Sequence, residues 1–91
     1  MELYTHQEIQ YQIADKIKAL RKQKKLTQKQ MSMKADIPLS TYARIEQLGE
    51  GSLKDFTKIL MALNRADEMS KILQITELTP IETYHKLKGA L

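Results

Sequence analysis

The sequence predicts an all-α fold, and three observations support that prediction. Apolar residues recur at intervals of three and four positions along several segments, which is the spacing of one helix face. Helix-capping pairs, in which Ser or Thr precedes an acidic or amide side chain by three positions, recur along the chain. No segment alternates apolar and polar residues as a half-buried strand does. The 91 residues suffice for one domain with a single modest core.

The first predicted helix covers residues 6–24 and opens with the capping pair Thr5 and Glu8. Its apolar residues follow helical spacing and are expected to face the core. These residues are Ile9, Ile13, Ile17 and Leu20. The N-terminal part of this helix is an extension, and we expect Leu3, Tyr4 and Ile9 to cover either the domain or a second copy of it.

A second helix is predicted over residues 28–35, because Thr27 and Gln30 form a reciprocal capping pair at its start. The residues expected on its inward face are Met31, Ser32 and Ala35. Asp36 falls where the following turn needs a residue that tolerates positive φ. Ile37 is then expected to anchor the turn in the core.

The third predicted helix covers residues 39–47 and follows Pro38, whose fixed φ suits the start of a helix. Tyr42 and Ile45 continue the apolar stripe of this helix. The residues that fall mainly on its other faces are Leu39, Ser40, Ala43 and Arg44. Those side chains are free to touch a partner.

Three more helices are predicted over residues 53–63, 66–75 and 80–88. Ser52 with Asp55 and Thr79 with Glu82 are the capping pairs, and Pro80 suits the first position of the last helix. The apolar stripe of the helix over 53–63 consists of Leu53, Phe56, Ile59, Leu60 and Leu63.

Residues 26–46, with the pattern LTQ, a small residue, a turn, a buried Ile and a closing IE, resemble the helix-turn-helix of the Cro/cI-type (XRE-like) regulators. The matching residues are Leu26, Thr27, Gln28, Ser32, Asp36, Ile37, Ile45 and Glu46. Two positions depart from that pattern: Asp36 replaces the usual Gly, and Pro38 replaces the usual capping Ser or Thr. The resemblance continues through residues 52–64, which are similar to the fourth helix of HipB-like antitoxin members, and more weakly through RADEMSKIL and TPIETYHKLKG.

The resemblance implies a lambda-repressor-like DNA-binding domain, a five-helix bundle with N- and C-terminal helical extensions. The whole chain, residues 1–91, would form this single domain. The motif would occupy residues 28–47, the core bundle about 13–64, and the C-terminal extension 65–91.

In the docking mode of this family, the second helix of the motif lies in the major groove. That places DNA base-reading on Leu39, Ser40, Thr41 and Arg44. Arg44 could grip guanine O6 and N7, or form a surface salt bridge to Glu46 or Glu50. Leu39 could meet a thymine methyl, or plug a dimer or core contact. Ser40 could serve a phosphate as readily as a base.

Contacts to DNA phosphates are carried over to the start of the motif and to the loop after it. The residues concerned are Gln28, Lys25, Lys29, Gln47, Ser52 and Lys54. In several members of the family, the positions of Arg21 and Glu46 form a partly buried structural ion pair, and we expect the same pair here.

The net charge of +4 is unevenly distributed. Residues 16–35 hold eight basic side chains and no acidic ones, whereas the rest of the chain holds seven basic and eleven acidic side chains. A basic tract alone is usually a solvated face. Its position next to the motif favours contact with a phosphate backbone, through the release of counterions.

The predicted function is therefore a sequence-specific DNA-binding transcription regulator, a homodimeric repressor of its own operon. One alternative is an antitoxin whose main role is to bind a HipA-like kinase toxin. Another is a helix-turn-helix that binds only proteins, against which Arg44 and the basic tract argue. The dimer is expected from the two-fold geometry of operators. Its interface is assigned to Met69, Ile72, Leu73, Ile75 and Leu78.

Little in the sequence supports an enzyme, a metal site or a cofactor. His6 and His85 are isolated at opposite ends, and no nucleophile–His–carboxylate set or phosphate-binding loop occurs. The absence of Cys excludes disulfides and thiolate metal sites. No apolar run approaches the roughly 18 residues of a membrane-spanning helix, and we expect a cytoplasmic protein with no membrane partner.

Overall fold

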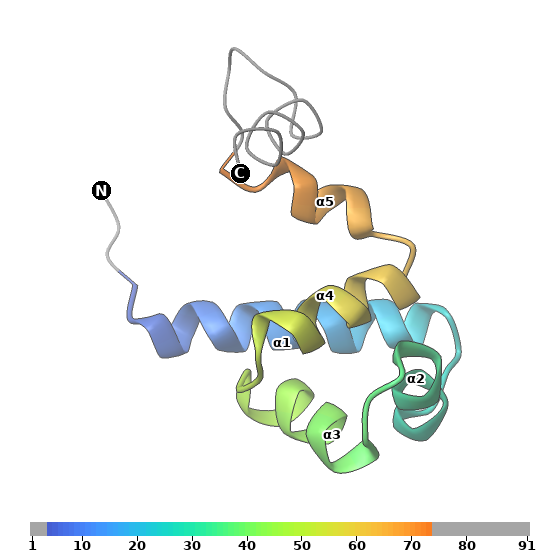
Figure 1. Ribbon diagram of the computed structural model, residues 1–91. Helices are drawn as coiled ribbons and strands as arrows, with labels where there is room; N and C mark the ends of the chain where they lie inside the picture. The colour runs from blue at the N-terminus through green and yellow to red at the C-terminus, as the bar shows by residue number, and fades with distance from the viewer. Residues whose placement is uncertain (1–3, 74–91) are drawn as a thin grey trace.

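The computed structural model describes residues 4–73, which form five α-helices and no strand (Figure 1). The helices are α1 (His6–Gln23), α2 (Gln28–Ala35), α3 (Leu39–Leu48), α4 (Leu53–Ala62) and α5 (Ala66–Lys71). The all-α prediction is confirmed, and the first four helices end within one residue of their predicted bounds. α5 stops at Lys71 rather than at residue 75, because Ile72 adopts an extended backbone. The predicted helix over 80–88 lies outside the described residues.

The core lies where α2, α3 and α4 meet α1. α1 packs on α3, α2 packs on both α3 and α4, and α5 packs on α4. The buried cluster consists of Ile17, Met31, Ala35, Ile37, Tyr42, Ile45, Ile59, Ala62 and Leu63. In Figure 1, α5 lies on the side of α4 away from α3. The two halves of the motif are therefore held by the same core, and α5 stands apart from them.

The buried face of α1 differs from the predicted stripe. Ile9 and Ile13 were expected in the core, but they are 45% and 39% exposed, whereas Ala14 is fully buried. Gln10 turns inward because its Nε2 donates a hydrogen bond to the carbonyl oxygen of Gly49, at 3.1 Å. The inward face of α1 therefore runs through Gln10, Ala14 and Ile17, and its first part is offset by one residue from the predicted stripe.

One prediction for the α4 stripe is also wrong. Leu53 is 72% exposed, because it occupies the first position of α4 and the neighbouring helices pack against later turns. The other members of the stripe behave as expected: Ile59, Leu60 and Leu63 are buried, and Phe56 is half-buried.

The turn between α2 and α3 has the predicted left-handed residue. Asp36 has φ of 57°, and its N–H bonds the carbonyl oxygen of Met33 at 3.1 Å. The N–H of Ile37 bonds the carbonyl oxygen of Ser32 at 3.0 Å, which completes a Schellman-type helix end. This closure directs Ile37 into the core, as the sequence predicted, and it sets the angle at which α3 leaves α2.

Candidate nucleic-acid interface

The start of α2 is fixed by a complete capping box. The hydroxyl oxygen of Thr27 accepts from the N–H of Gln30 at 3.1 Å, and the Gln30 side chain accepts from the N–H of Thr27 at 2.9 Å. On the same helix, the buried Ser32 hydroxyl donates to the carbonyl oxygen of Lys29 at 2.7 Å. Its small side chain adds little bulk on the inward face. α3 can therefore pack on α2 with its outer face left open.

α3 divides into a buried and an exposed face. Tyr42, Ile45 and Glu46 are buried. Five side chains are exposed along the helix, namely Leu39, Ser40, Arg44, Gln47 and Leu48, while Thr41 and Ala43 are half-buried. The side chains predicted to read bases thus lie together on the first two turns of α3, with Thr41 the least accessible of them.

Arg44 forms the surface ion pair that the sequence left as one alternative. Its Nη2 and Nε donate to the same carboxylate oxygen of Glu50, at 2.7 and 3.0 Å. Both side chains are more than half exposed. Such a pair contributes little to folding stability, so the fold does not depend on Arg44 keeping this partner.

A buried ion pair joins α1 to the end of α3. Arg21 Nη2 and Nε donate to the two oxygens of Glu46 at 2.8 and 2.9 Å, and Arg21 Nη1 donates to the carbonyl oxygen of Leu26 at 2.7 Å. The Arg21 side chain is 10% exposed and that of Glu46 is fully buried. The structure thus brings together the two residues that the resemblance paired, and their bidentate geometry locks α3 onto α1.

The environment of this pair sets the charge of its members. Burial by itself would raise the pKa of Glu46, but the hydrogen bonds from Arg21 and Gln28 outweigh it and hold the pKa below its ordinary value. Burial raises the pKa of the neighbouring Tyr42 phenol, whose hydroxyl has no hydrogen-bond partner among residues 4–73. Glu46 is therefore a carboxylate and Tyr42 a neutral phenol at neutral pH.

Gln28 takes part in the same cluster. Its side-chain Nε2 donates to Glu46 at 3.2 Å, and the residue is half-buried. The side chain was expected to meet a phosphate, but it is already engaged inside the motif. The backbone N–H of Gln28 still lies in the first turn of α2, where the helix dipole favours an anion.

The other predicted phosphate contacts are all exposed and come from three segments. Lys25 and Lys29 flank the start of α2, Gln47 lies on the last turn of α3, and Ser52 and Lys54 lie at the start of α4. The Ser52 hydroxyl also caps α4, because it accepts from the N–H of Asp55 at 3.0 Å. All but one of the basic residues in 16–35 are exposed, the exception being Arg21.

The sequence did not point to Gln10, although this residue anchors the loop that follows α3. Its hydrogen bond to Gly49 places the end of α3 against α1. The signal that could have found it is spacing, because Gln10 precedes Ala14 by four positions and Ile17 by seven.

Two other features are absent from residues 4–73. This part of the chain contains no group of three or more His, Cys, Asp or Glu placed to hold a metal ion. It also contains no helix long and apolar enough to cross a membrane.

Comparison with known protein families identifies a match. A family model described as Helix-turn-helix matches residues 17–68, which is more than half of the chain. The matched range contains α2, α3 and α4 whole, together with the C-terminal part of α1 and the start of α5. No curated protein and no solved structure matches the chain.

Proposed function

The chain belongs to the helix-turn-helix family of DNA-binding transcription regulators, and on that premise we propose that it is a homodimeric repressor of its own operon. The exposed face of α3 carries this proposal. Leu39, Ser40 and Arg44 project from a helix whose opposite face is fixed by the core and by the buried Arg21–Glu46 pair. A rigid helix with a solvent-exposed face is what major-groove reading requires.

Each of these three side chains has a chemical counterpart on the DNA. The planar guanidinium of Arg44 matches guanine O6 and N7, and Leu39 matches the methyl group of thymine. Ser40 can donate to or accept from either a base edge or a phosphate. The backbone N–H of Gln28 and the exposed basic residues around α2 would hold the phosphate backbone, with an affinity that falls as salt rises.

Arg44→Ala is expected to remove sequence preference without removing DNA binding. The loss of a bidentate guanine contact should reduce the preference for the upstream DNA of the gene over scrambled DNA by roughly 5- to 150-fold, which corresponds to about 1–3 kcal/mol. Fluorescence anisotropy across a salt series measures both the sequence preference and the affinity for DNA. The matched control is Arg65→Ala, which removes an exposed, ion-paired arginine from beside α5. If wild-type protein does not distinguish the two DNAs, the proposed base-reading is wrong.

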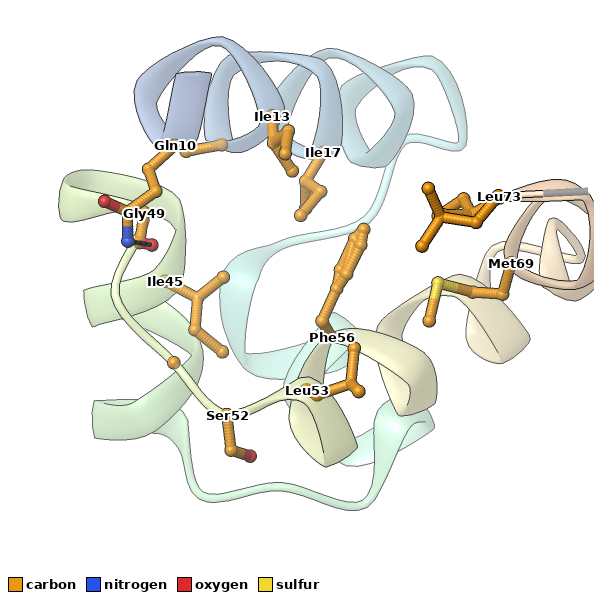
Figure 2. A pocket seen from close by; sticks show the side chains of 13 residues that line it. Gln10, Ile13, Ile17, Ile45, Gly49, Ser52, Leu53, Phe56, Met69 and Leu73 are labelled. Carbon is orange, nitrogen blue, oxygen red and sulfur yellow. Dashed lines mark hydrogen bonds between the residues drawn. The ribbon is translucent and has the colours of Figure 1, made fainter. Parts of the chain in front are cut away.

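The proposed dimer uses the apolar groove beside α5. This groove of about 600 Å³ is lined by α1, α4 and α5, and at one end by Ile45 of α3 and the loop after α3 (Figure 2). Met69 and Leu73 face Ile13 and Phe56 across it, and Leu73 is 93% exposed. Of the predicted interface, Met69, Ile72 and Leu73 line this groove, while Ile75 and Leu78 lie outside the described residues.

A second copy is the occupant that suits this groove, because a two-fold operator requires paired recognition helices about 34 Å apart. α5 lies on the side of α4 away from α3 (Figure 1), and Leu39, Ser40 and Arg44 do not line the groove, so a contact centred on α5 would leave them free to meet DNA. Burying the apolar side chains that line the groove would stabilise the dimer.

Sedimentation at micromolar concentration should show a dimer that Ile72→Glu dissociates, because a carboxylate cannot be buried against an apolar partner without a large cost. Met61→Glu is the control, since Met61 is exposed on α4 but does not line the groove. A strict monomer that still binds a half-site would contradict the proposed dimer.

The antitoxin alternative stays a prediction. A HipA-like kinase toxin encoded next to this gene would support it, and failure of the two proteins to co-purify would count against it. Either function acts on DNA or on a partner in the cytoplasm, which is the location we propose.

A further inference from the structure

The contact between Arg44 and Glu50 uses only one edge of the guanidinium. Nε and Nη2 both donate to one oxygen of Glu50, at 3.0 and 2.7 Å. A guanidinium has five N–H groups, so two hydrogens on Nη1 and one on Nη2 remain. One hydrogen on Nη1 and the one on Nη2 point outward side by side, and this outer edge can donate to guanine O6 and N7 together.

The backbone on both sides of Glu50 is held in place. Gly49 adopts φ of 67° and its carbonyl oxygen accepts from Gln10 at 3.1 Å. Gly51 packs so closely on Ile45 that an added Cβ would lie 2.6 Å from Cγ1 of that side chain. Glu50 is therefore presented from a loop that is anchored to both α1 and α3.

Stability does not explain this arrangement. Both members of the pair are more than half exposed, so their attraction is screened by water and adds little to folding. A carboxylate near DNA also opposes binding, because it repels phosphates. A long, flexible arginine, in contrast, loses less freedom on binding if it is already held in the bound orientation.

We propose that Glu50 is a positioning residue for DNA recognition, which orients Arg44 so that its outer edge faces a guanine. This inference rests on the proposed function, namely that α3 reads bases. Glu50 lowers the affinity for DNA of any sequence and raises the selectivity for sites with guanine opposite Arg44.

The test is a double-mutant cycle of wild type, Glu50→Ala, Arg44→Ala and the double variant, measured by anisotropy on upstream and scrambled DNA. Glu50→Ala should bind scrambled DNA more tightly than wild type and lose selectivity by roughly 2- to 12-fold, the range expected for one side chain left to be ordered on binding. In the Arg44→Ala background, Glu50→Ala should leave the selectivity ratio unchanged. Glu50→Gln, which keeps an acceptor oxygen, should retain part of the selectivity.

The control is Glu68→Ala, which removes the exposed partner of Arg65, and it should leave the ratio at the wild-type value. If wild type is selective and Glu50→Ala is equally or more selective, Glu50 merely competes with DNA for Arg44 and the inference is overturned while the proposed function stands. If wild type shows no selectivity, base-reading by α3 and this inference fail together.

Discussion

Glu46→Ala is expected to lower the free energy of unfolding by about 3–5 kcal/mol, the range for breaking a buried ion pair by removing one partner. The substitution leaves the Nε and Nη2 of Arg21 without their acceptors, and the Arg21 side chain is only 10% exposed. It also removes the acceptor of Gln28. Urea denaturation followed by circular dichroism measures the loss.

The matched control is Glu68→Ala, because Glu68 pairs with Arg65 at 2.7 Å on the surface. Its loss should cost less than about 1 kcal/mol. A double replacement of Arg21 and Glu46 by Met and Leu should recover most of the loss, since no unpaired charge is left buried. If Glu46→Ala cost no more than Glu68→Ala, the pair would not be a buried one in solution.

The Glu46 carboxylate should also make the stability of the domain depend on pH under acidic conditions. Because the pKa of Glu46 is lower in the folded state, its contribution is complete above the unfolded value of about 4.5 and is lost as the pH falls through the folded pKa. The free energy of unfolding of the wild type, measured from pH 7 to pH 3, should therefore decline below about pH 4.5. Glu46→Gln, which has no proton to gain, should start less stable and show a shallower decline.

Gly49→Ala is expected to destabilise the domain by about 2–5 kcal/mol, from backbone strain and overlap together. Gly49 has φ of 67°, which any residue with a Cβ adopts at a cost. The added Cβ would also lie 2.6 Å from the carbonyl oxygen of Gln10, which is backbone and cannot swing away. Thermal or urea unfolding gives the change.

Asn64→Ala separates the two effects. Asn64 has φ of 59° and is exposed at the end of α4, so alanine there meets the backbone strain without the close approach to α1. It should cost clearly less than Gly49→Ala. Equal losses for the two variants would show that α1 yields to the added Cβ, and that the contact between Gln10 and Gly49 is not rigid.

The helices of this protein could be predicted because the signals that begin and end them are local. The capping box of Thr27 and Gln30 depends on residues three positions apart, and the left-handed turn at Asp36 is closed by its own neighbours. The charge tract of residues 16–35 is likewise a property of adjacent residues. The pairing of Arg21 with Glu46 came from the resemblance, because 25 positions separate them and spacing alone does not join them.

Only the tertiary structure decided which face of each helix is buried and which side chains pair. The sequence by itself determined where the helices start, the turn between α2 and α3, and the open face of α3. Packing against the end of α3 turned Gln10 and Ala14 inward in place of Ile13. Likewise, the loop at Gly49 and Gly51 brought Glu50, and not Glu46, to Arg44. Helix signals act over one turn of chain, whereas burial and side-chain pairing depend on how distant segments meet in space.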